Sequence, residues 1–293
     1  MAIKPITAQQ HLAQIIKNKV GVEHAKSDSE ATTKHLAQDT VSKTVNPIPH
    51  YNSTESTLQR AQKRRKLALV RKQNNIESIL GLAQHYCPPV TSQGEPDPDW
   101  IERFLELAED TSNSNIQKLW AKVLAGEVIN PGSFSYKSLI TLKHITPKEA
   151  DVLQIATGCA GKSANDGFHQ IITGSYLTPS LLNFLSPNKK SYVNLSSAGL
   201  NYPDILTLID IELIYQQEIE SKAFEGGESQ SLNFANGTLT LTAKRKGCIL
   251  TYYKFTQTGF SLARLTSNKL SNQYLECLRK ALEKSFEVNF ANK

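Results

Sequence analysis

The residues best suited to chemistry are the cations that lie between Leu58 and Gln73. This stretch has no aspartate or glutamate, and its cations are Arg60, Lys63, Arg64, Arg65, Lys66, Arg71 and Lys72. The whole 293-residue chain has a formal net charge of +6, so the rest of the chain carries −1 when these seven charges are subtracted. Lysine and arginine neutralise phosphates, and such contacts make binding depend on salt. The stretch therefore predicts a contact with a polyanion, nucleic acid first among them. A solvated helix face, an acidic protein partner and an anionic membrane surface are the alternatives.

A second group of cations, Lys244, Arg245 and Lys246, precedes Gly247. The flanking segments alternate between apolar and polar residues, so this group is expected at a turn between two strands. It is a candidate for a further polyanion contact. The alternative is a charged hairpin tip, because exposed turns are normally polar.

The segment Ala156–Ser163 matches the loose pattern of a phosphate-binding loop, which ends in Gly-Lys-Ser. In such a loop the backbone N–H groups hold phosphate, the lysine reaches the outer phosphates and the hydroxyl binds magnesium. A nucleotide-binding hydrolase using this loop is therefore one alternative function. The context opposes it, because the loop must follow a strand and open a helix, whereas a helix start precedes this segment and a turn follows it.

No other motif indicates catalysis. The four cysteines, Cys87, Cys159, Cys248 and Cys277, form no CxxC pair, which argues against a disulfide framework or zinc site and suits a reducing compartment. We expect no catalytic residues, metal or cofactor, and the sequence favours a non-enzyme over an enzyme. The N-terminus lacks the apolar core of a signal peptide, and no apolar run is long enough to span a bilayer, so a cytoplasmic protein is expected.

One long helix over residues 54–86 is expected to carry the first group of cations. Apolar residues become more frequent towards its C-terminal half, so that half is expected to dock. Residues 1–53 are polar and predicted to be a disordered tail. Prolines between residues 88 and 96 mark a hinge after the helix.

Residues 97–165 are predicted to form a helical central domain. Both tryptophans of the chain, Trp100 and Trp120, lie on apolar helix faces and are expected to anchor a core; a stacking site is the alternative. Thr146–Glu149 reads as a capping box that opens the fourth helix of this domain.

Residues 166–293 are predicted to combine helices with a small antiparallel β part. The expected elements are a helix at Tyr202–Ile209, a hairpin around Asn236-Gly237, a strand at Ile249–Phe255 and a final helix at about Ser267–Glu287. This order resembles winged-helix domains, in which a helix reads DNA and a hairpin touches phosphate. The helix at Asp204–Asp210 is apolar and acidic, which does not suit a DNA groove. The fold class is therefore mostly α, with a winged-helix-like α+β module at the C-terminus.

Four short runs carry a further resemblance: LWAKVLAGEV from Leu119, PGSFS from Pro131, SLITL from Ser138 and ITPKEADVL from Ile145. Over about Trp100 to Leu153 the chain resembles a bacterial family known as a domain of unknown function, which implies no activity. It is more loosely similar to the abortive-infection alpha proteins of phage defence, which would imply an antiviral role. The expected function is a binding or regulatory protein that contacts nucleic acid. A protein-interaction or defence effector without enzymatic activity is the first alternative.

Overall fold

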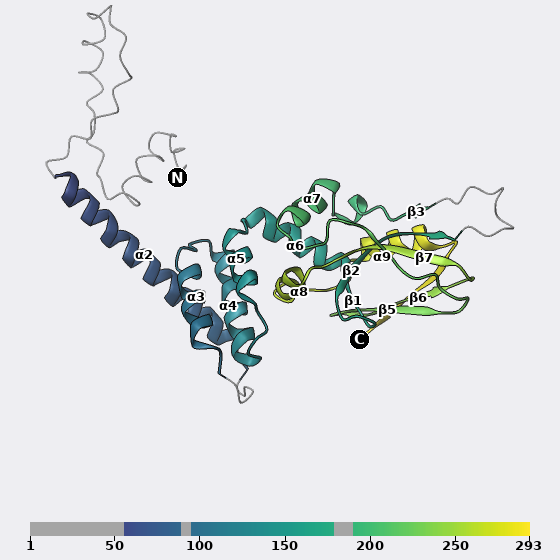
Figure 1. The fold of residues 1–293 in the computed structure, drawn as a ribbon, viewed down its shortest axis with the longest axis horizontal. Helices are drawn as coiled ribbons and strands as arrows, with labels where there is room; N and C mark the ends of the chain where they lie inside the picture. The colour runs from purple at the N-terminus through teal and green to yellow at the C-terminus, as the bar shows by residue number, and fades with distance from the viewer. Residues whose placement is uncertain (1–55, 89–94, 179–189) are drawn as a thin grey trace, which may run out of the picture. The chain divides into compact units, whose positions relative to one another are not determined.

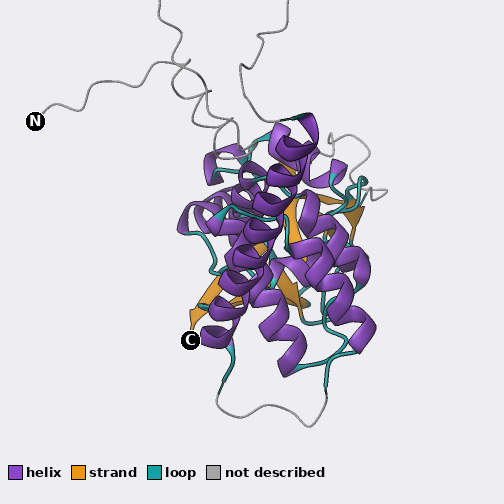
Figure 2. Cartoon of the chain, turned by 90° about the vertical axis from the view of Figure 1, so that its left-hand side faces the viewer, coloured by secondary structure: helices purple, strands orange, loops and turns teal. Residues whose placement is uncertain are grey.

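The computed structural model describes residues 56–88, 95–178 and 190–293 (Figure 1). The predicted tail at residues 1–53 and most of the predicted hinge lie outside the described residues. The chain separates into two units, Met1–Ile76 and Glu77–Lys293. More of the described residues lie in helices than in strands (Figure 2). The domain limits given above stay a prediction.

The described helices follow the prediction closely in the first half of the chain. They are α2 (Thr57–Tyr86), α3 (Pro98–Ala108), α4 (Ser114–Ile129), α5 (Tyr136–His144), α6 (Pro147–Cys159), a short 3-10 helix η2 (Ser196–Ala198), α7 (Tyr202–Asp210), α8 (Gln257–Ala263) and α9 (Asn272–Leu282). The described strands are β1 (Gly161–Ser163), β2 (His169–Leu177), β3 (Ser191–Tyr192), β4 (Ile219–Glu220), β5 (Ser229–Phe234), β6 (Gly237–Ala243), β7 (Cys248–Lys254) and β8 (Phe286–Asn292).

Side-chain caps define where the helices of the central block begin. Asp97 accepts hydrogen bonds at the start of α3, Asn113 at the start of α4 and Ser135 at the start of α5. Thr146 and Glu149 form the predicted capping box of α6. Each cap satisfies N–H groups that have no partner within the helix, so these boundaries follow from local sequence.

The two tryptophans belong to the core of this block, as predicted. Trp120 is fully buried, and its ring meets the ring of Phe104 edge-on with a centroid separation of 5.3 Å. Trp100 stacks on the other side of Phe104 at 5.4 Å, and its indole N–H donates to the carbonyl oxygen of Phe134 at 2.8 Å. These rings link α3, α4 and the segment before α5, so they act in packing.

The β part is larger than the sequence predicts. Eight antiparallel strands form one sheet in the order β4-β7-β2-β1-β5-β6-β8, and β3 pairs with β2 beside this path. The predicted hairpin is present as β5 and β6, in register from Ser229–Thr242 to Phe234–Gly237. Its neighbours β1 and β8 were not predicted, so the hairpin lies inside a wide sheet. The predicted combination of helices with an antiparallel β part is confirmed, although the sheet has more strands than expected, and the winged-helix assignment is not confirmed.

Helix α9 is packed inside the curve of this sheet. It contacts both β2 and β8, which β1, β5 and β6 separate in the strand order, so the sheet must curl around the helix. Tyr274, Leu278 and Leu282 on α9 are fully buried, and the Tyr274 hydroxyl donates to the carbonyl oxygen of Ile172 at 3.0 Å. The curl brings β5 and β7 within reach of one pocket.

Candidate functional site

The basic stretch lies along α2, as predicted. Lys63, Arg64, Arg65 and Lys66 have exposed side chains, and the other three cations, Arg60, Arg71 and Lys72, are half-buried. The guanidinium of Arg60 donates to the Thr57 hydroxyl at 3.1 Å. Within the part of the chain that the structure describes, Arg64, Arg65 and Lys66 take part in no ion pair. These three adjacent cations are accessible to a polyanion.

The C-terminal half of α2 docks, in agreement with the rise in apolar residues. Ile79 and Ala83 are buried, and the Ser78 hydroxyl donates to the Gln117 side chain on α4 at 3.0 Å. The ammonium of Lys122 lies 5.8 Å from the centre of the Tyr86 ring. The cations and the docking surface therefore occupy successive segments of one helix.

The second cationic group lies in the turn between β6 and β7, as expected, but acidic and carbonyl groups surround it. The Lys246 ammonium pairs with Glu225 at 3.0 Å, and the Lys244 ammonium donates to the carbonyl oxygen of Glu283 at 2.6 Å. Arg245 is also exposed. Because Glu225 offsets one of the three charges, this turn offers less excess charge than α2. Its role in polyanion binding stays a prediction.

The segment that matches a phosphate-binding loop does not form one. Residues 156–159 are the last turn of α6, and Gly161–Ser163 is strand β1. This order, helix then strand, is the reverse of the strand and helix that such a loop must connect. The Lys162 ammonium lies over the Phe260 ring at 5.6 Å from its centre. The backbone of β1 is occupied in pairing with β2 and β5, so it cannot cradle phosphate.

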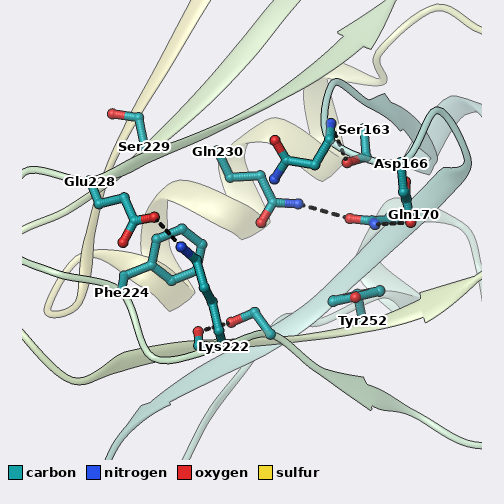
Figure 3. Close-up of a pocket in the computed structure, with 11 residues that line it drawn as sticks. Ser163, Asp166, Gln170, Lys222, Phe224, Glu228, Ser229, Gln230 and Tyr252 are labelled. Carbon is teal, nitrogen blue, oxygen red and sulfur yellow. Dashed lines mark hydrogen bonds and ion pairs between the residues drawn. The ribbon is translucent and has the colours of Figure 1, made fainter.

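A polar pocket of about 390 Å³ opens within the curled sheet (Figure 3). Its lining comes from the β1–β2 turn, from β2, β5 and β7, and from the segment between β4 and β5. The lining residues are Ser163, Asn165, Asp166, Gln170, Ser221, Lys222, Phe224, Glu228, Ser229, Gln230 and Tyr252. Sequence reasoning did not identify this pocket, because its walls are far apart in the chain.

Two buried amides lie at the centre of the pocket wall. Gln170 on β2 is 3% exposed and Gln230 on β5 is 5% exposed. The Gln230 amide nitrogen donates to the Gln170 amide oxygen at 2.9 Å, and the Gln170 nitrogen donates to the Asp166 carboxylate at 3.4 Å (Figure 3). This chain of hydrogen bonds fixes both amides across the gap between β2 and β5.

Ion pairs satisfy the carboxylates at the two ends of the pocket. The Lys254 ammonium lies 2.8 Å from Asp166, and the Lys222 ammonium lies 2.7 Å from Glu228. Burial opposes ionisation of Asp166, but hydrogen bonds from Lys254 and the Phe168 N–H outweigh it and lower the pKa of this carboxyl. The hydrogen bond from Lys222 likewise lowers the pKa of Glu228. Both carboxylates are thus held charged and already paired.

One signal in the sequence could have pointed to this pocket. Side chains two residues apart in a strand share a face, so Gln230 must lie on the same face as the buried Leu232. A glutamine at a core-facing position of a strand needs a hydrogen-bonding partner. The sequence did not reveal that this partner is Gln170 on β2.

The fold and these sites define a mixed helical and antiparallel-sheet protein with a basic helix and a polar pocket in its sheet. Among the residues that the structure describes, no cluster of three or more histidine, cysteine, aspartate or glutamate side chains is arranged to hold a metal ion. No helix in the described ranges has both the length and the apolar character needed to span a bilayer.

The family model for proteins of unknown function named DUF2806 matches residues 59–279, and the chain belongs to that family. Comparison with curated proteins and with solved structures finds no match. The match begins within the basic stretch of α2 and includes every strand except β8. It supports the expected family of unknown function and shows no link to abortive-infection proteins.

Proposed function

We propose that this protein is a cytoplasmic binding or regulatory protein whose helix α2 contacts nucleic acid. The observation that carries the proposal is the exposure of consecutive cations on a helical stretch without an acidic residue, where Arg64, Arg65 and Lys66 form no ion pair among the described residues. An exposed cation can replace a counterion at a phosphate, whereas a buried or paired one cannot do so without a cost.

The helical geometry sets what these cations can touch. Neighbouring residues on a helix are separated by about 100°, so four consecutive cations surround the rod rather than form a single stripe. Contacts of this kind fit the sugar-phosphate backbone better than base edges, because they need no fixed orientation. We therefore expect affinity without strong sequence preference.

Fluorescence anisotropy with a labelled duplex and a labelled single strand, measured across a salt series, tests the proposal. The test variant carries Arg64→Gln, Arg65→Gln and Lys66→Gln together. Each phosphate contact contributes about −0.9 to the slope of log K against log salt on a duplex, so losing three contacts should flatten the slope by roughly 2 to 3.

The matched control changes three exposed lysines elsewhere, Lys118→Gln, Lys148→Gln and Lys284→Gln, and alters the net charge by the same amount. It should bind much like the wild type. Equal losses in both variants would mean that total charge, not α2, governs binding. Failure of the wild type to bind either probe at low salt would remove the proposal.

A second candidate, a protein-interaction or defence effector, is favoured by the apolar residues exposed on the same helix. Leu58, Leu69 and Val70 are 68%, 59% and 52% exposed. A helix that exposes both leucines and cations also suits an acidic, apolar groove on a partner protein. The C-terminal module, which the sequence predicts to be winged-helix-like, would serve the same role without reading DNA. Affinity capture with and without nuclease distinguishes the two candidates, because partners retained after nuclease favour a protein contact.

A further inference from the structure

The pocket in the curled sheet has unused hydrogen-bonding capacity on one side chain. The Gln230 amide has two N–H groups and one oxygen. One N–H is used by Gln170. Among the hydrogen bonds between described residues, the second N–H and the oxygen of Gln230 have no partner, and Gln230 lines the cavity. This side chain therefore has one donor and one acceptor left, both in the plane of its amide, for whatever fills the pocket.

The amide edge is held in place rather than mobile. Gln230 is 5% exposed, and its partner Gln170 is in turn tied to Asp166. A fixed donor–acceptor pair loses little conformational entropy when it binds a ligand. A polar group with this degree of burial is otherwise costly, because its remaining hydrogen bonds must be made to water in a confined space.

The charges of the pocket exclude a strongly charged ligand. Asp166 is paired with Lys254, and Glu228 is paired with Lys222. Neither positive nor negative charge is left in excess around the cavity. A phosphate would therefore meet no free cation, and an ammonium group would meet no free carboxylate. The ligand should be neutral.

The side chains that line the pocket favour a flat heterocycle over a saccharide. The rings of Phe224 and Tyr252 both border the cavity, which gives a planar ligand apolar surface to cover. The carboxylates that could accept from the vicinal hydroxyls of a sugar are already engaged by lysines. The volume of about 390 Å³ lies near the lower end of the range for small-molecule sites.

We propose that this pocket binds a neutral nucleoside, whose base pairs with the Gln230 amide through an adjacent donor and acceptor. Glutamine makes such a two-bond contact with the N6 and N7 atoms of adenine, so adenosine is the first probe. The proposal does not depend on the polyanion contact of α2, since it concerns a neutral ligand and a different set of residues.

Isothermal titration calorimetry on the full chain, with adenosine as the titrant, tests the proposal. Wild-type protein should bind one adenosine per chain with a dissociation constant below about 1 mM. Adenosine monophosphate should bind no more tightly than adenosine, because the pocket has no spare cation for its phosphate. Glucose should not bind.

Two variants locate the site. Gln230→Glu keeps the shape of the side chain but removes its donor, and affinity should fall at least about ten-fold. Asn165→Trp changes an exposed residue in the β1–β2 turn that lines the pocket, and it should block the cavity without replacing either buried amide. The control, Gln273→Leu, removes an exposed amide on α9 away from the pocket and should leave affinity unchanged.

Thermal unfolding of each variant establishes that it is folded, and Asn165→Trp keeps the test valid if Gln230→Glu is not. The proposal is overturned if no saturable heat is seen with adenosine, guanosine, cytidine or uridine. It is equally overturned if Asn165→Trp binds as the wild type does, or if glucose binds and competes with the nucleoside.

Discussion

The Nε2 atom of His169 lies 2.9 Å from the side-chain amide of Asn268, which joins β2 to the segment between α8 and α9. With the amide oxygen accepting from His169, the amide nitrogen donates to the carbonyl oxygens of Thr157 and Ala160, each at 2.9 Å. The imidazole thus carries its proton on Nε2. Its Nδ1 atom is buried and has no partner among the described residues, so a second proton there would be a buried charge without an acceptor.

This arrangement predicts loss of stability in weak acid. Burial, aided by repulsion from Lys162, lowers the pKa of His169 from 6.5 to about 4. Since the unfolded chain keeps the higher pKa, it binds the proton first, and stability falls as the pH drops from about 6.5 towards 4. Between pH 7.5 and pH 5 this group should remove roughly 2 kcal/mol of the free energy of unfolding, measured by urea titration.

The variant His169→Gln should flatten this part of the pH profile, because glutamine can still donate to Asn268 but does not titrate. His144→Gln, which changes an exposed histidine on α5, is the control and should keep the wild-type profile. Carboxylates also titrate in this range, so the contribution of His169 is taken from the difference between the pH profiles of the wild type and the variants. Identical profiles for wild type and His169→Gln would contradict the assignment.

The helical half of the protein could be predicted from local sequence because its boundaries are set by local hydrogen bonds. The capping box at Thr146 and Glu149 and the proline after it specify the start of α6 without help from the rest of the chain. The hairpin at Asn236-Gly237 is similar, since its turn determines the pairing of β5 with β6.

The sheet could not be predicted to the same extent because its strands do not all alternate. Strand β2 is buried along both faces for most of its length, so it lacks the two-residue period of a strand with one solvated face. Strand β8 does alternate from Phe286 to Phe290, but the predicted final helix at about Ser267–Glu287 overlaps its first two residues, and no strand is predicted after it. The pocket depends on both of these strands, because the pairing of β2 and the curling of the sheet towards β8 create it.

A second prediction concerns Gly259, where two backbones approach closely. A Cβ atom at this position would lie 1.9 Å from the carbonyl oxygen of Leu213, which also accepts a hydrogen bond from the Thr256 N–H at 3.0 Å. Helix α8 can therefore pack here only with glycine. Gly259→Ala should cost about 3 kcal/mol of stability by overpacking.

The matched control is Gly81→Ala, since Gly81 is also helical but has nothing within 4 Å of the added carbon. There the substitution should stabilise by roughly 0.5 to 1 kcal/mol, because alanine favours the helix. Thermal unfolding of both variants shows whether the two substitutions change stability in opposite directions. A Gly259→Ala protein as stable as the wild type would mean that α8 and Leu213 are not in contact.

The buried carboxylate of Glu127 supplies a third prediction. Its two oxygens accept from the N–H groups of Gly132 at 2.5 Å and of Phe134 at 3.0 Å, so it holds the connection between α4 and α5. Glu127→Ala should lose about 2 kcal/mol, because the buried N–H of Phe134 is left without an acceptor. Glu127→Gln keeps one acceptor and should lose less. Since Phe134 also accepts from the Trp100 indole, tryptophan fluorescence should change in Glu127→Ala and not in the control Glu106→Ala, which changes an exposed glutamate on α3.

The free thiols provide the last prediction. Cys159 and Cys248 are buried, whereas Cys87 and Cys277 are half-buried. Burial, with a smaller contribution from Cys277, raises the pKa of Cys159 to about 12, and burial also raises the pKa of Cys248. The thiolate is the reactive form, so native protein at pH 8 should release two equivalents of chromophore quickly from a disulfide reagent and four in denaturant. Cys277→Ser should lose one fast equivalent, since Cys87 remains. Rapid reaction of a third thiol in the native protein would show that the structure around Cys159 or Cys248 opens far more readily than the burial of these thiols implies.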